Sequence, residues 1–399
     1  MNTSGTISDK ETRADLDRLS KYIGGKNALV TQGGGQRGIF TAGVLDAFLL
    51  SNFDPFDEFY GTSAGALNLC AYLCRQHGLG KAFILELTTD ANFFNLFSYV
   101  RRKQFMNLDW ALDRISEFPY RLDVDMGAQV LAKRKAYAAV TSAHSLHDHY
   151  FPILESNWRE VLIATCAIPR LYPHEVKLGD DLYIDGGVSA SIPVQEAWRR
   201  GARFVAVIRT ECPDADAVES GSPMKPLPSA KPYNEAHWLH EPLQNIQGQW
   251  RQKLSYWKQE WSGLLHQQIE RSKLQKREQM NLELLNGGRW LFGADDIYRL
   301  SHLIGDKFDS GLADMLMVHY QTYSLTQEFL RAPPDDVYIL QIVPSEPLRS
   351  RSLLSSQEDL LYDYELGLTA GYRFIDQFNQ AQSAYQSRIA SSDYFPRDH

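Results

Sequence analysis

The chain has 399 residues, of which 44% are hydrophobic and 23% charged, and its formal net charge is -8 at neutral pH. This is ordinary globular composition with enough length for a large core, and the acidic balance argues against wholesale nucleic-acid binding. The cysteines are too few for a disulfide scaffold, and we expect small core residues in a reducing compartment. The four cysteines are Cys70, Cys74, Cys166 and Cys212.

The first 26 residues are polar and charged, and we expect a solvated tail that carries at most a short helix. The tail has no apolar h-region, so it is not predicted to be a secretory signal. No stretch of the chain approaches the roughly 18 apolar residues that cross a bilayer. These features predict a cytoplasmic location, peripheral to the inner face of the membrane if the chain contacts lipid.

Residues 27–211 alternate short apolar runs with helical patterns. Strands are expected, in chain order, at 28–32, 57–60, 136–141, 182–184 and 203–210. Helices are expected over 38–50, 64–77 and 193–200. This alternation predicts an α/β fold, with a mainly parallel central sheet between two layers of helices.

The composition changes after residue 211. Residues 212–335 begin with a stretch rich in proline and serine and continue as a helical, tryptophan-rich region, which predicts a linker and a helical insertion. Residues 336–399 are expected to form a further strand at 337–343, then a helix over 357–379 and a polar tail. Within 245–277, apolar residues at helical spacing alternate with basic ones, so this helix packs on the core, forms a lid, or contacts anionic membrane. Core packing is favoured, because tryptophans at helical spacing are usually buried.

The sequence Gly61-Thr62-Ser63-Ala64-Gly65 is a G-x-S-x-G motif between a predicted strand and a predicted helix. Its glycines let neighbouring backbone pack around a strained turn that presents the serine hydroxyl. The positive end of the following helix would favour a developing oxyanion. Ser63 is therefore a candidate nucleophile, and the competing interpretation is a plain turn of small residues.

A second glycine cluster, GGGQRG, occupies residues 33–38 between the first predicted strand and the next helix. Its backbone N–H groups could form an oxyanion hole, cradle a phosphate, or make a plain turn. Gly33, Gly35 and Gly38 also match the G-x-G-x-x-G of a dinucleotide site. That site needs an acidic residue at the end of the second strand, whereas Glu58 is predicted to lie before or within it.

A base is needed to activate the serine hydroxyl. No histidine lies at a clear junction between a strand and a loop, so a Ser-His-Asp triad is not indicated. Asp185 ends a predicted strand, and a partly desolvated aspartate can accept the proton because burial raises the pKa of a carboxyl. The competing interpretation of Asp185-Gly186-Gly187 is an ordinary turn. Residues 144–149 hold three histidines, for which a polar loop is favoured over a metal site.

Residues 33–38, 61–65 and 185–187, in this order, resemble the motifs of the bacterial patatin-like phospholipase family, and residues 164–169 resemble that family's approach to its acid. The resemblance covers roughly residues 27–210. It implies a Ser-Asp dyad without metal or organic cofactor, in which Ser63 is the nucleophile and Asp185 the general base. The implied oxyanion hole consists of backbone N–H groups around Gly34, Gly35 and Arg37. The motif glycines are Gly33, Gly38, Gly61, Gly65, Gly186 and Gly187.

The resemblance implies hydrolysis of fatty-acyl esters in lipids, with the lipid class and acyl position left open. Gln32 departs from the family, in which Asp or Ser commonly precedes the glycines. Arg37 matches it, and its side chain either braces the loop, which is favoured, or meets a lipid phosphate. Two other classes stay open: a dinucleotide-binding oxidoreductase and a non-catalytic membrane-associated scaffold. Aromatic residues between 93 and 99 pack a helix or line an acyl tunnel, packing being favoured.

Overall fold

The computed structural model describes residues 19–93, 106–169, 171–211 and 310–392, all of which belong to one compact unit of the chain. The predicted helix at 245–277, most of the aromatic cluster at 93–99, and Cys212 lie outside the described residues. The predicted domain boundaries near 211 and 335 stay predictions.

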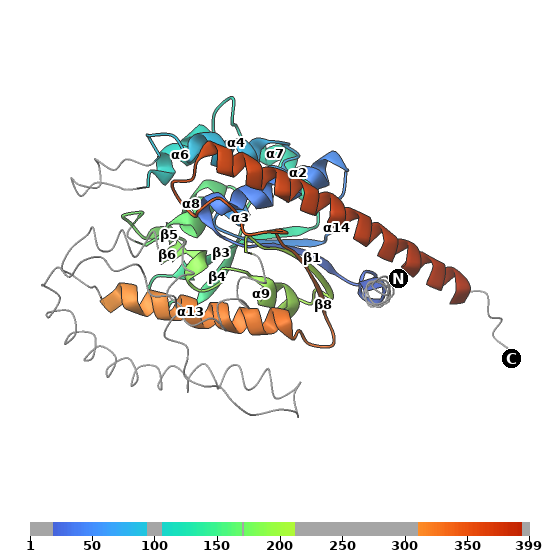
Figure 1. Cartoon of the computed structure of the whole chain (residues 1–399). Coiled ribbons are helices and arrows are strands. Elements are labelled where there is room, and N and C mark those ends of the chain that lie inside the picture. Colours follow the sequence, from blue (N-terminus) through green and yellow to red (C-terminus); the bar gives the residue numbers. More distant parts are fainter. Residues whose placement is uncertain (1–18, 94–105, 170, 212–309, 393–399) are drawn as a thin grey trace, which may run out of the picture. The chain divides into compact units, whose positions relative to one another are not determined.

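A mixed sheet of eight strands forms the centre of this unit (Figure 1). Its order is β5-β6-β3-β2-β1-β7-β8, and β4 also pairs with β3. Strands β1, β2, β3, β7 and β8 run parallel, whereas β4 and β6 run antiparallel to β3, and β5 runs antiparallel to β6. The strands are β1 Asn27–Thr31, β2 Glu58–Thr62, β3 Lys135–Ser142, β4 Asp148–Pro152, β5 Val176–Leu178, β6 Asp181–Asp185, β7 Phe204–Ile208 and β8 Tyr338–Ile342.

Helices cover both faces of the sheet, which confirms the predicted three-layer α/β/α class (Figure 1). Successive side chains of a strand point to opposite faces, so Leu29 joins the core beneath α2, α3 and α14, and Val30 joins the core beneath α9 and α13. The helices are α2 Gly38–Leu50, α3 Ala64–Leu73, α4 Leu79–Ala82, α6 Leu108–Arg114, α7 Val124–Leu131, α8 Trp158–Cys166, α9 Val194–Arg199, α13 Ser310–Arg331 and α14 Gln357–Ser392. Shorter helical turns are η1 Gly35–Arg37, η2 Phe83–Leu87 and η3 Gly186–Val188.

Helix α2 is buried along almost its whole length, because α14 packs over the side that faces away from the sheet. The two backbones approach closely at glycines. A β-carbon added to Gly43 would lie 2.2 Å from the carbonyl oxygen of Tyr364, and one added to Gly367 would lie 2.2 Å from that of Phe40. The Tyr364 hydroxyl also donates to a carboxylate oxygen of Asp46 over 2.8 Å. The C-terminal helix is thus part of the main core.

The predicted strands are present as β1, β2, β3, β6, β7 and β8, and each lies within a few residues of its expected place. Strands β4 and β5 and helix α8 were not predicted. The interpretation of residues 144–149 as a loop is wrong for His149, which lies in β4 and pairs with Val140. No group of three potential metal-ligating side chains occurs in the part of the chain that the structure describes.

The N-terminal tail is not wholly solvated, because residues 19–22 are helical and Leu19 is buried. The described cysteines, Cys70, Cys74 and Cys166, are buried and carry free thiols, as expected. Among the described helices, none combines the length and the apolar character that crossing a membrane requires.

Candidate active site

The loops that follow β1, β2 and β7 meet at the carboxyl ends of these parallel strands, the edge at which α/β sheets commonly bind ligands. Backbone hydrogen bonds join the loop after β1 to β7 and to the segment before α9. The N–H of Gln32 donates to the carbonyl of Ile208 over 3.0 Å, and that of Gly33 donates to Ser191 over 3.1 Å. The Gln32 side chain accepts the N–H of Thr210 over 3.1 Å. Glutamine at this family-atypical position therefore ties the glycine-rich loop to the end of β7.

Ser63 forms the sharp turn between β2 and α3. Its backbone has φ 51° and ψ -126°, a conformation that residues with a side chain seldom adopt. The turn packs directly against the end of β1: a β-carbon on Gly65 would lie 2.7 Å from the carbonyl oxygens of Thr31 and Gln32. Glycine is required there, and the strained strand-to-helix turn is the geometry expected of a G-x-S-x-G serine.

Asp185 ends β6 and its side chain is fully buried. One carboxylate oxygen, Oδ1, accepts the backbone N–H of Gly187 over 2.6 Å. The other, Oδ2, accepts no hydrogen bond from the described residues. Burial raises the pKa of Asp185 to about 7, although the Gly187 N–H and the side chain of Ser63 both act to lower it. The serine side chain therefore lies within interaction range of the carboxyl.

Strand β3 brings the serine turn and the carboxyl together. Thr62, the last residue of β2, pairs with Ala139, and Asp185 pairs with the next residue, Val140. Thr165 of α8 completes the junction. Its hydroxyl accepts the backbone N–H of Ser63 over 2.9 Å and donates to the carbonyl of Ala139 over 2.5 Å. One hydroxyl thus fixes the serine turn to β3.

The glycine-rich loop offers backbone donors beside this turn. Within the described chain, the N–H groups of Gly34 and Gly35 have no acceptor. The N–H of Arg37, which was also predicted to belong to the oxyanion hole, donates to the carbonyl of Gly34 over 3.2 Å. Gly34 and Gly35 are consequently the better candidates to stabilise an oxyanion.

The Arg37 side chain pairs with Glu211, with 3.5 Å between Nη1 and Oε1, and both side chains are largely buried. This ion pair joins the glycine-rich loop to the residues after β7. The contact is the one expected if the guanidinium braces the loop, which was the favoured interpretation.

Glu58, the acid considered for a dinucleotide site, is the first residue of β2 and so lies at the opposite end of that strand from Ser63. Its carboxylate contacts Lys26 over 2.6 Å and accepts the Tyr60 hydroxyl over 2.6 Å. A ribose-binding acid belongs at the carboxyl end of the strand, beside the glycines. The position of Glu58 therefore argues against a dinucleotide site.

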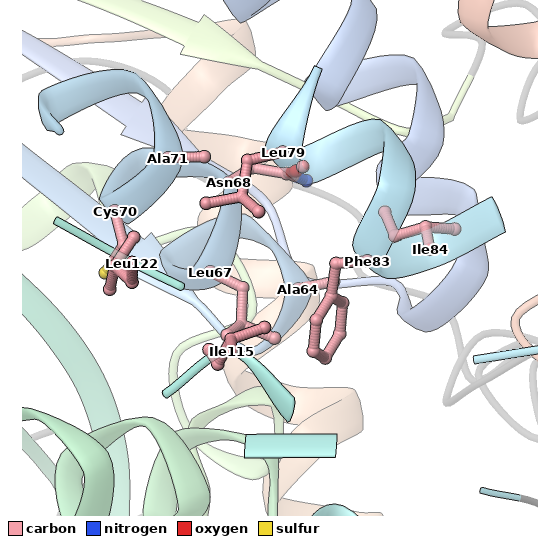
Figure 2. Close-up of a pocket in the computed structure, with 11 residues that line it drawn as sticks. Ala64, Leu67, Asn68, Cys70, Ala71, Leu79, Phe83, Ile84, Ile115 and Leu122 are labelled. Carbon is pink, nitrogen blue, oxygen red and sulfur yellow. The ribbon is translucent and has the colours of Figure 1, made fainter. Parts of the chain in front are cut away.

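An apolar pocket begins at Ala64, the residue after Ser63 (Figure 2). Helix α3 forms one side of it, and side chains from the segments around α4, η2 and α6 close the other. Among the described residues of its lining, Asn68 alone has a polar side chain, whose amide donates to the carbonyl of Gly38 over 2.8 Å. The lining residues are Ala64, Leu67, Asn68, Cys70, Ala71, Leu79, Gly80, Phe83, Ile84, Ile115 and Leu122.

Sequence reasoning assigned no role to Thr165, Cys166 or His319. The first two lie in the stretch that resembles the family's approach to its acid, so a signal was present without a role attached to it. Burial raises the pKa of the Cys166 thiol, Asp185 raises it further and the Ser63 side chain lowers it, so Cys166 lies beside both groups. His319 had no local signal, because only folding brings it near residue 187.

Comparisons with known proteins matched the chain to two family models, a curated relative and a solved structure. The family model described as patatin-like phospholipase matches residues 29–198, and that of a domain of unknown function (DUF6363) matches residues 309–382. The uncharacterized protein YjjU of Escherichia coli (strain K12) is 31% identical over 359 residues, which cover 90% of this chain and 79% of that protein. The crystal structure of VipD from Legionella pneumophila is 12% identical, with a TM-score of 0.31, and the match covers 90% of this chain and 67% of VipD.

Proposed function

The chain belongs to the patatin-like phospholipase family, and on that basis we propose that it is a serine lipid acyl hydrolase with a Ser63–Asp185 dyad. Family membership supports hydrolysis of lipid acyl esters in general. The dyad, the oxyanion donors and the assignment to phospholipids go further and are proposals. The relative YjjU is itself uncharacterized and adds no substrate.

In the proposed reaction, the Asp185 carboxylate takes the proton of Ser63 as the serine oxygen attacks the ester carbonyl carbon. The carbonyl oxygen becomes an oxyanion that the N–H groups of Gly34 and Gly35 stabilise. Collapse of this intermediate breaks the bond to the alcohol, which leaves with the proton held by Asp185. Water then attacks the acyl-enzyme, again giving a proton to Asp185, and the fatty acid leaves as Ser63 recovers its proton.

The observation that carries this proposal is the state of the Asp185 carboxyl. It is buried, one oxygen has no partner among the described residues, and its pKa is about 7. A general base is most effective when its pKa lies near the working pH. A carboxyl beside Ser63 with a pKa in this range can accept the serine proton near neutral pH. A carboxyl that only capped a turn would have no need to stay buried with one oxygen unpaired.

The apolar lining beside Ala64 suits the alkyl part of a fatty-acyl ester better than a polar group (Figure 2). Its free space of about 20 Å³ is that of a single water molecule, so an acyl chain would enter only as the surrounding apolar side chains move apart. Phospholipids, lysophospholipids and neutral acylglycerols all carry such a fatty-acyl ester. We also propose, as expected from the sequence, a cytoplasmic location, peripheral to the inner face of the membrane if the chain contacts lipid; residues 245–277, for which core packing was favoured over a lid or membrane contact, lie outside the described residues.

Labelling with a fluorophosphonate tests the proposal directly. The wild-type protein should gain the mass of one adduct, and peptide mapping should place the adduct on Ser63. Ser63→Ala should not react, and both Ser63→Ala and Asp185→Asn should lose turnover of a p-nitrophenyl ester while remaining folded by circular dichroism. Absence of any adduct on folded wild-type protein would favour the non-catalytic scaffold, and an adduct elsewhere would refute the assignment of Ser63.

Tight binding of a nicotinamide or flavin nucleotide that survives Ser63→Ala would instead favour an oxidoreductase. The location of Glu58 at the amino end of β2 argues against that outcome.

A further inference from the structure

Helix α13 lies outside the stretch that matches the patatin-like family model, yet it reaches the turn after Asp185. Its residue His319 is buried, with Nδ1 2.6 Å from the carbonyl oxygen of Gly187. The N–H of the same residue, Gly187, donates to Oδ1 of Asp185. A single peptide turn therefore connects the imidazole to the proposed base.

The chemistry of the two groups fixes the direction of the first hydrogen bond. A carbonyl oxygen only accepts, so Nδ1 of His319 carries the proton and donates. Burial lowers the pKa of His319, which favours the neutral ring with Nε2 unprotonated. Nε2 has no partner among the described residues, and it receives no hydrogen bond from Ser63. The ring is thus arranged to hold the turn and not to act as a base.

A buried polar network fixes the ring from its other side. The His319 ring stacks on that of Tyr323, one helical turn along α13, with 5.8 Å between ring centroids. The Tyr323 hydroxyl donates to Glu211, whose carboxylate also pairs with Arg37 over 3.5 Å and with Arg209 over 3.8 Å. The network therefore extends from the turn after Asp185 to the glycine-rich loop. The first segment carries the proposed base and the second the proposed oxyanion donors, so the mechanism requires a fixed distance between them.

We propose that His319 is a positioning residue of the active site, which holds the turn at 185–187 so that the carboxyl faces Ser63. The proposal rests on the proposed hydrolase function. It assigns a role to α13 that the family resemblance does not supply, because that resemblance ends near residue 210.

We expect the loss of the His319 side chain to slow the reaction by altering Asp185. Without the donor at Nδ1, the buried carbonyl of Gly187 loses its partner and the turn relaxes. The hydrogen bond from the Gly187 N–H to Asp185 then lengthens, and one of the two interactions that lower the pKa of this carboxyl weakens. The other groups that face the carboxyl, Ser63 and Cys166, are unchanged, as is Glu211 beside the ring.

The test compares three substitutions at one position. His319→Asn places an amide N–H near the place of Nδ1, His319→Gln keeps a similar volume and polarity but displaces the donor, and His319→Leu removes it. Val318→Ala, a truncation of the neighbouring buried residue on α13, serves as a control for loosened packing. For each folded protein, kcat and KM for a p-nitrophenyl ester are measured across pH.

His319→Leu and His319→Gln are expected to lower kcat about 10-fold to 100-fold with little change in KM, since small displacements of catalytic groups cost factors of this size. The acidic limb of their kcat/KM profiles should move to higher pH. His319→Asn should restore most of the rate, and Val318→Ala should leave the acidic limb in place. Should His319→Leu fail to fold, the contrast between His319→Asn and His319→Gln decides.

Two results would overturn the proposal: His319→Gln with wild-type kcat and an unshifted acidic limb, or His319→Asn impaired as severely as His319→Gln. Both presuppose an active wild type that a fluorophosphonate labels on Ser63. A wild type that neither reacts nor hydrolyses the ester contradicts the proposed function itself, and the role of His319 with it.

Discussion

Asp185 pairs with Val140 of β3, one position beyond the pairing that ends β2 at the serine turn. Thr62, the residue before Ser63, and Asp185 are therefore paired with consecutive residues of a single strand. Because β6 runs antiparallel to β3 while β2 runs parallel to it, both strands end at the same place on β3. The antiparallel strand β6, which adjoins the parallel part of the sheet at β3, is what delivers the carboxyl.

The pH dependence of turnover should reflect the buried carboxyl. The pKa of Asp185 is about 7, and a protonated carboxyl cannot accept the serine proton. We expect kcat/KM of the wild type to fall about 10-fold for each unit of pH below about 7, and to level off above about 8. Initial rates with a p-nitrophenyl ester, on protein shown to be folded at each pH, provide the measurement. A flat profile down to about pH 5 would contradict this role.

Replacing the carboxyl by an amide should stabilise the protein at alkaline pH. The pKa of Asp185 is higher in the folded state than the usual 3.8, so its contribution to stability is complete below about 3.8 and is lost as the pH rises through about 7. Asp185→Asn keeps the acceptor for the Gly187 N–H but never ionises. Its free energy of unfolding should exceed that of the wild type at pH 8 by a few kcal/mol, at most about 4. Urea unfolding of both proteins should show this gain shrinking toward about pH 4, and a gain independent of pH would argue against a raised pKa.

Thr165→Val should damage the serine turn. The substitution preserves shape but removes the hydroxyl that accepts the Ser63 N–H and donates to the Ala139 carbonyl. Two buried polar groups lose their partner, at a cost of about 1–3 kcal/mol each. We expect a lower free energy of unfolding and a kcat reduced about 10-fold or more. Thr165→Ser, which keeps the hydroxyl, is the matched control, and equal activity of both variants would show that the turn holds its geometry without this bond.

Filling the apolar pocket should change the preference for acyl-chain length. Ala71 lines the pocket two helical turns beyond Ala64, so a larger side chain there would fill space on that part of α3. Ala71→Leu is expected to lower kcat/KM for p-nitrophenyl octanoate about 10-fold while leaving the acetate ester within about 2-fold, because only the longer chain reaches that part of the pocket. Equal losses for both esters would place the acyl chain elsewhere.

Gly367→Ala should weaken the docking of α14 on α2. Alanine is the better helix former by about 1 kcal/mol, which alone would stabilise α14. However, its β-carbon would lie 2.2 Å from the Phe40 carbonyl oxygen, and overpacking of this kind costs about 1–3 kcal/mol or more. We expect the clash to prevail, giving a lower midpoint of urea unfolding. Thr369→Ala, at an exposed position of the same helix, should show no such loss.

Elements with a strong local pattern were predictable. Strand β1 is a short apolar run that stops at glycine, and the helix predicted over 38–50 matches α2 at both ends. Strand β4 was missed, because its aspartate and histidine resemble a polar loop, and its pairing with β3 is a contact that the local sequence does not show. The burial of α2 on its outer side was missed for a similar reason, since it depends on α14, far away in the sequence.

By itself, the sequence determined which groups are available to react. The glycines around Ser63, the glycine-rich loop and the Asp-Gly-Gly turn are local features, and their backbone requirements can be read without knowing what surrounds them. The tertiary structure decided the environment of Asp185 and the contact of His319 with the turn that follows it. A raised pKa exists only where packed elements exclude water, and a hydrogen bond between helix α13 and residue 187 leaves no periodic trace in the chain.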